Sequence, residues 1–280
     1  MSTRDTNSRT GQGYGPIDLK TDRPHAARVY DVLLGGKTNY PADRKQAEKI
    51  IANVPTARPI ALANRIFMHR ATRYLAAEAG VRQFLDIGTG IPTSPNLHEV
   101  AQGVAPESRV VYVDNDPIVL AHSRALHTSD PAGATAYIDA DVTDPDTVLA
   151  SPLLRETIDL DRPVGLSMCA LLHWLPGDPY TVVKHLVDAL APGSHVVLTH
   201  MAPLDDVSEG FRGTGSEVHG RTREEFAEFF AGLDLLEPGI VVPQRWRPAL
   251  VEVGREDDTL DEALTPFWAG VGVKRAAAEG

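Results

Sequence analysis

A short segment at residues 85–90 restricts the fold more than any other feature of the chain. It reads Leu-Asp-Ile-Gly-Thr-Gly, and residues 110–114 then read Val-Val-Tyr-Val-Asp. An apolar run that ends in Asp-x-Gly-x-Gly predicts a buried strand that turns sharply into a helix, and the second apolar run predicts the next strand. Asp114 stands 24 positions after Gly90. This order of strand, glycine turn, helix, strand and acid predicts a pocket for a cofactor that carries adenosine.

Strand and helix patterns alternate from Val81 onward. Such alternation predicts an α/β fold, a doubly wound, Rossmann-like parallel sheet with helices on both faces. The strand candidates are residues 83–87, 109–113, 135–138, 164–168 and 195–199, with two more near 235–242 and 268–274. The helix candidates between them are residues 95–103, 117–127, 145–154 and 180–190, and residues 243–265 are expected to form a loop.

Three regions are expected along the chain. Residues 1–24 are polar and predict a flexible N-terminal tail. Residues 25–80 show helical periodicity and predict a helical extension that forms a cap or lid. The expected helices run from Pro24 to the pair Gly35-Gly36, from 42 to 53 and from 58 to 79. On the third helix, Arg65, His69 and Arg73 recur every four residues, and this row is interpreted as a solvated face. Residues 81–280 form the predicted α/β domain.

Composition narrows the class of protein. The 280 residues are 42% hydrophobic, which is ample for a core, and the formal net charge of −11 with no dense Lys/Arg run disfavours a nucleic-acid partner. No apolar run approaches the ~18 residues of a membrane span, so no membrane association is expected. Cys169 is the single cysteine, which suits a reducing cytoplasm. The ten histidines lack the spacing of a helix-borne zinc site, so no metal is predicted.

The turn after the first strand departs from the dinucleotide fingerprint. Residues 88–93 read Gly-Thr-Gly-Ile-Pro-Thr, without the third glycine that lets a helix pack beneath a pyrophosphate. A smaller, zwitterionic tail on the nucleoside is therefore favoured, and an NAD(P)-dependent oxidoreductase becomes the weaker alternative. Ser94 is expected to cap the following helix, with Pro95 in its first position.

Acidic residues follow the next two strands. Asp114 is expected to accept hydrogen bonds from a ribose diol, although it could also simply cap a turn. Asp116 fits a helix cap and a contact with the adenine edge about equally. Asp141 is preferred to Asp139 as the acceptor for an adenine amine, and Asp144 fits the cap of the next helix.

These motifs resemble those of class I S-adenosylmethionine-dependent methyltransferases. The closest resemblance is to a bacterial family of proposed S-adenosyl methyltransferases, formerly classed as a domain of unknown function. The segments that carry the likeness are Arg-Val-Tyr-Asp-Val-Leu-Leu-Gly-Gly-Lys at 28–37, Asn-Tyr at 39–40, Phe-Leu-Asp-Ile-Gly-Thr-Gly-Ile-Pro-Thr at 84–93, Val-Asp-Asn-Asp-Pro at 113–117, Leu-Ala-Pro-Gly-Ser at 190–194 and Ala-Gly-Val-Gly-Val-Lys at 269–274.

The resemblance implies a seven-stranded sheet with an antiparallel last strand, an N-terminal helical extension, and S-adenosyl-L-methionine as cofactor. On this mapping, Gly88 and Gly90 approach the methionine part and Asp86 orients the amino group or the turn. Residues 39–40 and Tyr30 would fold over the cofactor as a lid, although Gly35-Gly36 could simply stop a helix. Asp114 would bind the ribose, and Asp141 and Val142 the adenine. Thr89, Asn115 and Ala170 are also implied to bind the cofactor.

The segment after the fourth strand, residues 168–176, is expected to border the methyl group. It lacks the Asn/Asp-Pro-Pro-aromatic motif of enzymes that methylate base amino groups, which counts against a nucleic-acid substrate. His173 could serve as a general base for a hydroxyl nucleophile, or it could line the cofactor pocket without proton transfer. Trp174 is expected to shape a pocket, and Cys169 to be a small core residue.

Residues 204–221 hold four glycines and suggest either a flap on the substrate side or an ordinary loop. A helix should follow, opened by Thr222 and Glu225 as a capping box. Further candidates for substrate contact are His200, Met201, Phe211 and His219. The sequence thus predicts a cytoplasmic methyltransferase that acts on a small-molecule acceptor. A module that binds S-adenosylmethionine or S-adenosylhomocysteine without catalysis would show the same cofactor motifs and remains open.

Overall fold

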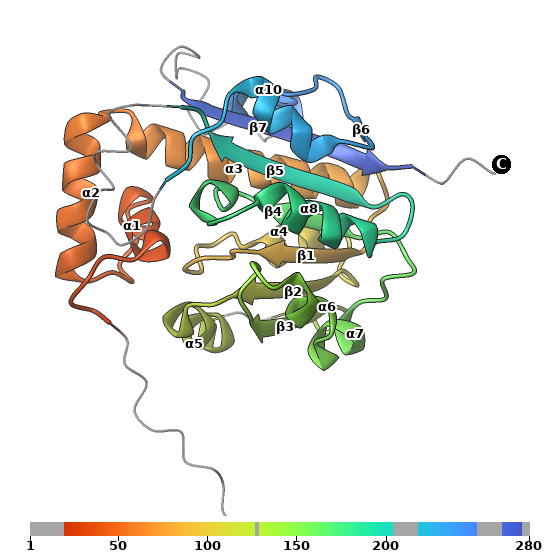
Figure 1. Ribbon diagram of the computed structural model, residues 1–280. Coiled ribbons are helices and arrows are strands. Elements are labelled where there is room, and N and C mark those ends of the chain that lie inside the picture. Colours follow the sequence, from red (N-terminus) through yellow and green to blue (C-terminus); the bar gives the residue numbers. More distant parts are fainter. Residues whose placement is uncertain (1–19, 127–128, 204–217, 251–264, 276–280) are drawn as a thin grey trace, which may run out of the picture.

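The computed structural model describes residues 20–126, 129–203, 218–250 and 265–275, and it contains a seven-stranded sheet in the order β3-β2-β1-β4-β5-β7-β6 (Figure 1). Strands β1 to β5 pair in parallel, whereas β7 is antiparallel to both of its neighbours. The predicted mostly parallel sheet is therefore confirmed. The strands are β1 Gln83–Ile87, β2 Arg109–Asp114, β3 Ala134–Asp139, β4 Gly165–Met168, β5 His195–Met201, β6 Leu233–Leu235 and β7 Phe267–Lys274.

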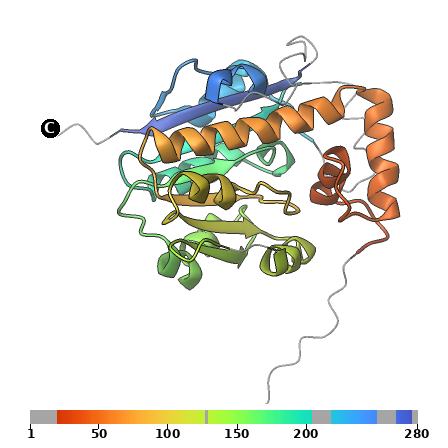
Figure 2. The same ribbon diagram turned by 180° about the vertical axis from the view of Figure 1, so that it is seen from behind.

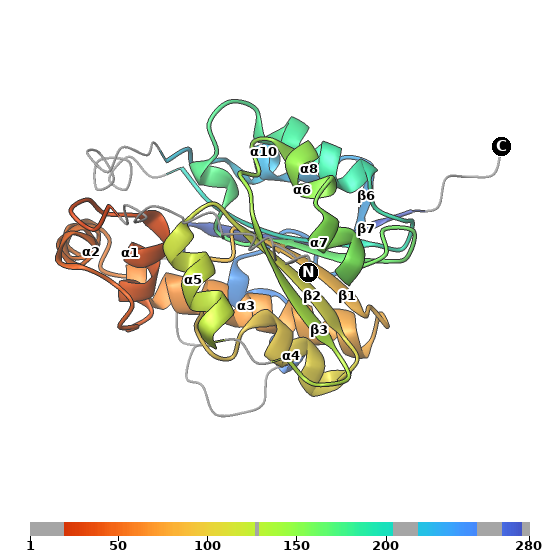
Figure 3. The same cartoon turned by 90° about the horizontal axis from the view of Figure 1, so that it is seen from below.

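Helices cover both faces of the sheet, as Figure 3 shows. Side chains alternate along a strand, so Leu85 and Ile87 enter one core while Phe84 enters the other. The second core includes Phe67 and Leu97 from the helices of that face. The helices are α3 Ala57–Ala77, α4 Leu97–Val104 and α5 Pro117–Leu126 on one side, and α6 Pro145–Leu149, α7 Pro152–Thr157, α8 Pro179–Asp188 and α10 Arg223–Ala227 on the other.

Two N-terminal helices, α1 Ala26–Leu33 and α2 Pro41–Asn53, stand beyond the edge at which the parallel strands end (Figures 1 and 2). Gly35 ends α1 with a φ of +78°, a conformation that glycine adopts without strain. The long α3 begins near α1 and α2 and then runs across the sheet, where Phe67 and Leu75 join its core. The three predicted N-terminal helices are therefore present, and the third also belongs to the core of the sheet.

A proline and a different N-cap account for two differences from the predicted helices. Pro152 divides the expected helix at 145–154, because proline cannot continue the hydrogen bonding of a helix, and α6 and α7 result. The helix expected from residue 95 instead begins at Leu97, with Asn96 as its N-cap. The assignment of Ser94 as cap was therefore wrong, and its hydroxyl donates instead to Glu99.

The C-terminal part also differs in detail. The strand expected near 235–242 was placed wrongly: β6 covers Leu233–Leu235, and Val241 forms an isolated bridge to Ala269. Pro238 lies between them and has no N–H to donate to a ladder. Thr222 and Glu225 form the predicted capping box of α10. Short 3₁₀ turns complete the described chain: η1 Leu172–Trp174, η2 Glu228–Phe230, η3 Pro243–Arg245 and η4 Pro248–Leu250. Within the described ranges, every helix is too short or too polar to span a membrane.

Candidate functional site

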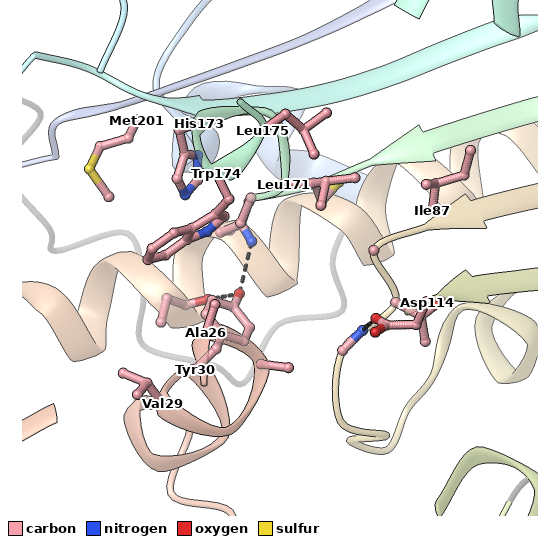
Figure 4. Close-up of a pocket in the computed structure, with 18 of the residues that line it drawn as sticks. Ala26, Val29, Tyr30, Ile87, Asp114, Leu171, His173, Trp174, Leu175 and Met201 are labelled. Carbon is pink, nitrogen blue, oxygen red and sulfur yellow. Dashed lines mark hydrogen bonds between the residues drawn. The ribbon is translucent and has the colours of Figure 1, made fainter. Parts of the chain in front are cut away.

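A cavity of about 410 Å³ lies at the carboxyl ends of the parallel strands, between the sheet and the N-terminal helices (Figure 4). Sites of this kind are typical of open α/β sheets. The residue predicted as a base and all ten residues predicted to bind a cofactor line this one cavity: His173, Tyr30, Asp86, Gly88, Thr89, Gly90, Asp114, Asn115, Asp141, Val142 and Ala170. The structure thus brings the predicted set together, and the role of each member remains a prediction.

The glycine turn is held by Asp114. Gly88 and Gly90 have φ values of +70° and +67°, in a region where residues with a Cβ are strained. The Asp114 carboxylate accepts one hydrogen bond from the Gly90 N–H through Oδ2 and one from the Asp116 N–H through Oδ1, both at 2.9 Å. Asp114 therefore does cap a turn, and it also faces the cavity.

Asp114 keeps acceptor capacity for a ligand. Only 9% of the residue is exposed, and each carboxylate oxygen uses one hydrogen bond to the protein. Each oxygen has a second lone pair. Burial raises the pKa of Asp114, while the N–H groups of Asp116 and Gly90 act in the opposite direction. A donor from a ligand would stabilise the ionised form further.

Asp86 and Arg65 bring opposite charges to the wall of the cavity. Removal from water raises the pKa of Asp86 to about 6, although Ser167, Arg65 and Thr89 all lower it. The hydroxyl of Thr89 donates to the backbone oxygen and to Oδ2 of Asp86, at 3.2 and 3.3 Å. This contact joins Asp86 to the glycine turn, and its predicted role toward the amino group or the turn stays a prediction.

The interpretation of the row on α3 as a solvated face was wrong for Arg65 and His69. Arg65 lines the cavity and donates to the carbonyls of Thr93 and Pro95, and His69 also contacts the Pro95 carbonyl at 2.9 Å. Within the described structure, the Nε of Arg65 is buried without a hydrogen-bond partner. Sequence spacing gave no signal for this role, because both acceptors are backbone carbonyls of a loop about 30 residues away.

A chain of hydrogen bonds links α1 to the end of β4. Tyr30 donates to the Ala61 carbonyl at 2.9 Å and accepts from Asn64 at 2.8 Å (Figure 4). Asn64 accepts from the Thr199 hydroxyl at 2.6 Å, and that hydroxyl accepts from the Ala170 N–H at 2.8 Å. Ala170 has a φ of +55°, so this N–H helps to hold a strained turn. Sequence reasoning missed Asn64 and Thr199, which carry no recognisable motif.

The acidic residues after β2 and β3 differ in their positions and contacts. Asp141 lines the cavity, where its Oδ2 accepts from Asn115 at 3.2 Å. Partial burial would raise the pKa of Asp141, but the hydrogen bonds from Thr143 and Asn115 hold it below its usual range. Asp139 is exposed and lies outside the residues described as lining the cavity. Asp116 caps α5 through the Ile118 N–H at 2.8 Å, which favours the cap of its two predicted roles.

His173 lies at the other side of the cavity and is only 2% exposed. Its ring centroid is 5.3 Å from that of Trp174 and 5.7 Å from that of Phe267. Burial, with His200 and Arg221 nearby, holds the pKa of His173 well below 6.5. The imidazole is therefore neutral at pH 7, and the same burial makes it a weaker base than a free imidazole.

The remaining candidates are placed differently. Met201 lines the cavity, whereas His200 and His219 are not among the residues that line it in the described part of the chain. The backbone N–H of His219 donates to the His173 carbonyl at 2.9 Å. Phe211 lies outside the described residues. Cys169 lines the cavity as well as packing against the core, and burial raises the pKa of its thiol to about 12. A thiol that stays protonated agrees with the prediction that Cys169 is no nucleophile.

The predicted lid residues beside Tyr30 lie elsewhere. Tyr40 packs against Ile91 and against Ile118 of α5. The amide of Asn39 donates to the Asp31 carboxylate at 2.9 Å. Neither is among the residues that line the cavity in the described part of the chain. In the same part, no three His, Cys, Asp or Glu side chains gather as a metal site would require.

Comparison with known proteins identifies the family. A family model described as S-adenosyl methyltransferase matches residues 13–275. The chain belongs to this S-adenosyl methyltransferase family. The chain is similar to a DUF574 family protein from Streptomyces avermitilis, whose crystal structure is 43% identical with a TM-score of 0.84, over 91% of this chain and 99% of that one. A proposed methyltransferase from Thermobifida fusca is 41% identical with a TM-score of 0.84, over 95% of this chain and all of the other.

More distant structures share the fold alone. The plantazolicin methyltransferase BpumL, solved in complex with S-adenosylhomocysteine, is 13% identical with a TM-score of 0.51 and covers 89% of this chain and 95% of its own. A comparison with curated proteins gives no match. Membership in this family supports the prediction of an S-adenosyl methyltransferase, and the names of the two structures above specify no methyl acceptor.

Proposed function

We propose that the protein transfers a methyl group from S-adenosyl-L-methionine to a small-molecule acceptor. One observation carries the proposal: a single cavity contains the glycine turn, the carboxylate of Asp114 and the opposed charges of Asp86 and Arg65. These are the groups that a nucleoside with an amino-acid tail requires. The membership in the S-adenosyl methyltransferase family supports the same assignment.

The residues present fit this cofactor. Asp114 has free lone pairs for the two ribose hydroxyls, and Asp141 with Asn115 would meet the adenine edge, with Val142 against the ring. Asp86 would hold the ammonium group of the methionine tail. The unpartnered Nε of Arg65 would donate to the tail carboxylate, because a buried guanidinium nitrogen favours an anionic acceptor.

Methyl transfer requires the protein mainly to align the two reactants. When bound, the cofactor supplies a methyl carbon activated by its sulfonium group. The acceptor atom would bond to that carbon as the carbon–sulfur bond broke, with the electron pair left on sulfur. The protein aligns the two reactants in a cavity largely shielded from water, an arrangement that can lower a barrier by about 7–11 kcal/mol. Neutral His173 would accept the proton that a hydroxyl acceptor loses.

Calorimetric titration with S-adenosylhomocysteine and with NAD⁺ tests the cofactor assignment. The proposal predicts one site for S-adenosylhomocysteine and no heat of binding with NAD⁺, because the turn lacks the third glycine that a pyrophosphate requires. Binding of NAD⁺ in preference to S-adenosylhomocysteine would overturn the proposal.

Transfer of a labelled methyl group separates an enzyme from a module that only binds the cofactor. With a hydroxyl acceptor, His173→Ala should lower the rate by about 10²–10⁴-fold, while the affinity for S-adenosylhomocysteine stays within twofold. Full activity of His173→Ala would contradict the role as base and leave His173 as a wall of the pocket.

A further inference from the structure

The cavity has two chemically different halves. Its charged side chains in the described structure, with His25 beside them, gather near the ends of β1 to β3: Arg65, Asp86, Asp114 and Asp141. The opposite half lies between the inner sides of α1 and α2, η1 and the end of β5. Six apolar side chains line that half: Val29, Leu33, Ile50, Val54, Trp174 and Met201.

The apolar half has a continuous wall. Val29 and Ile50 are buried at 3% and 5% exposure, and Leu33, Val54, Trp174 and Met201 pack against them in the same cluster. In the view of Figure 4, the indole of Trp174 lies between Met201 and Val29, with His173 above it. No Lys, Arg, Asp or Glu from the described residues lines this half.

From this division we infer that the methyl acceptor is a neutral, apolar molecule with a flat ring, seated against Trp174. The inference rests on the proposed function, because the polar half is assigned to the cofactor. A charged acceptor would lose its hydration at a wall that offers no counter-ion, which weakens its binding. A neutral ring instead gains free energy by burying its apolar surface and can stack on the indole.

The position of His173 agrees with such an acceptor. It borders the apolar half and is neutral, so it adds a proton acceptor without adding a charge. A hydroxyl on the ring could lose its proton to the imidazole as the new bond to carbon forms. The acceptor would thus carry one polar nucleophilic atom on an otherwise apolar frame.

Three naphthalene probes with one ring system and different charges test this inference. The neutral 2-naphthol, the anionic naphthalene-2-sulfonate and the cationic 2-naphthylmethylammonium are titrated into the full chain with S-adenosylhomocysteine at saturation. We expect 2-naphthol to occupy one site, with both charged probes at least about tenfold weaker. Equal or tighter binding of either charged probe, or no binding of 2-naphthol, would overturn the inference.

Variants of Trp174 locate the probe. Trp174→Ala should weaken 2-naphthol at least about tenfold, and Trp174→Phe, which keeps a ring, should restore most of the affinity. Unchanged affinity in Trp174→Ala would place the probe elsewhere and contradict the inference. The affinity for S-adenosylhomocysteine, measured in the same variants, should stay within twofold. If S-adenosylhomocysteine fails to bind the native protein while 2-naphthol binds, the proposed function fails and the apolar site stands.

Discussion

Replacing Asp114 by asparagine removes the charge from the residue that joins the glycine turn to the proposed ribose site. In the native protein, both carboxylate oxygens accept backbone N–H groups, one from Gly90 and one from Asp116, each at 2.9 Å. An asparagine side chain has one oxygen and one NH₂ group. One of the two N–H groups would therefore face another donor, and the ribose would lose one of its two acceptors.

The size of the effect follows from these bonds. The clash at the backbone N–H is present with and without the ligand, so the affinity reports the lost bond to the ribose. A hydrogen bond to a charged group contributes about 1.5–3 kcal/mol, so the Kd for S-adenosylhomocysteine should rise roughly 10- to 140-fold by calorimetry. Asp139→Asn is the matched control, because Asp139 pairs with Asp114 in the β2–β3 register and lies outside the described lining of the cavity. A Kd for Asp114→Asn within threefold of the native value, in a variant with native thermal stability, would refute this reasoning.

Three further predictions concern stability. The pKa of Asp86 is raised to about 6 from 3.8, so its ionisation opposes folding fully above pH 6 and not at all below pH 3.8. In urea titrations, Asp86→Asn should raise the free energy of unfolding by up to about 3 kcal/mol at pH 7, and this gain should disappear near pH 4. The same variant should bind S-adenosylhomocysteine more weakly at pH 7. A Cβ on Gly36 would lie 1.9 Å from Oδ1 of Asp31, whereas one on Gly35 would meet no atom within 4 Å. Gly36→Ala should therefore lower the melting temperature more than Gly35→Ala, which carries only the strain of its positive φ; the reverse order would contradict the packing around α1. Tyr30→Phe leaves the Asn64 amide without its acceptor, and we expect a loss of about 1–3 kcal/mol in chemical denaturation, with no change counting against the link between α1 and α3.

Much of the fold, and the half of the cavity proposed to bind the cofactor, could be predicted from the sequence because both depend on local patterns. The apolar runs fix the strands, and strands whose carboxyl ends share one edge bring Asp86, Asp114 and Asp141 together. Element boundaries were less predictable where a proline or a better cap intervened, as at Asn96 and Pro152.

The site residues that could not be predicted from the sequence act through contacts with distant parts of the chain. Arg65 binds carbonyls near Pro95, and Asn64 bonds to Thr199 across 135 residues. Helical periodicity shows which residues share a face of α3, but it does not show which partner that face meets. The apolar half of the cavity has the same origin, because it forms only where α1, α2, η1 and β5 converge.

A crystal structure of the protein with S-adenosylhomocysteine bound tests the central claim most directly. The account predicts that the ribose hydroxyls lie at hydrogen-bond distance, about 2.7 Å, from the Asp114 carboxylate, with the amino-acid tail between Asp86 and Arg65. The apolar half beside Trp174 should remain open for an acceptor. Density for the nucleoside away from Asp114, or in the apolar half, would contradict the account.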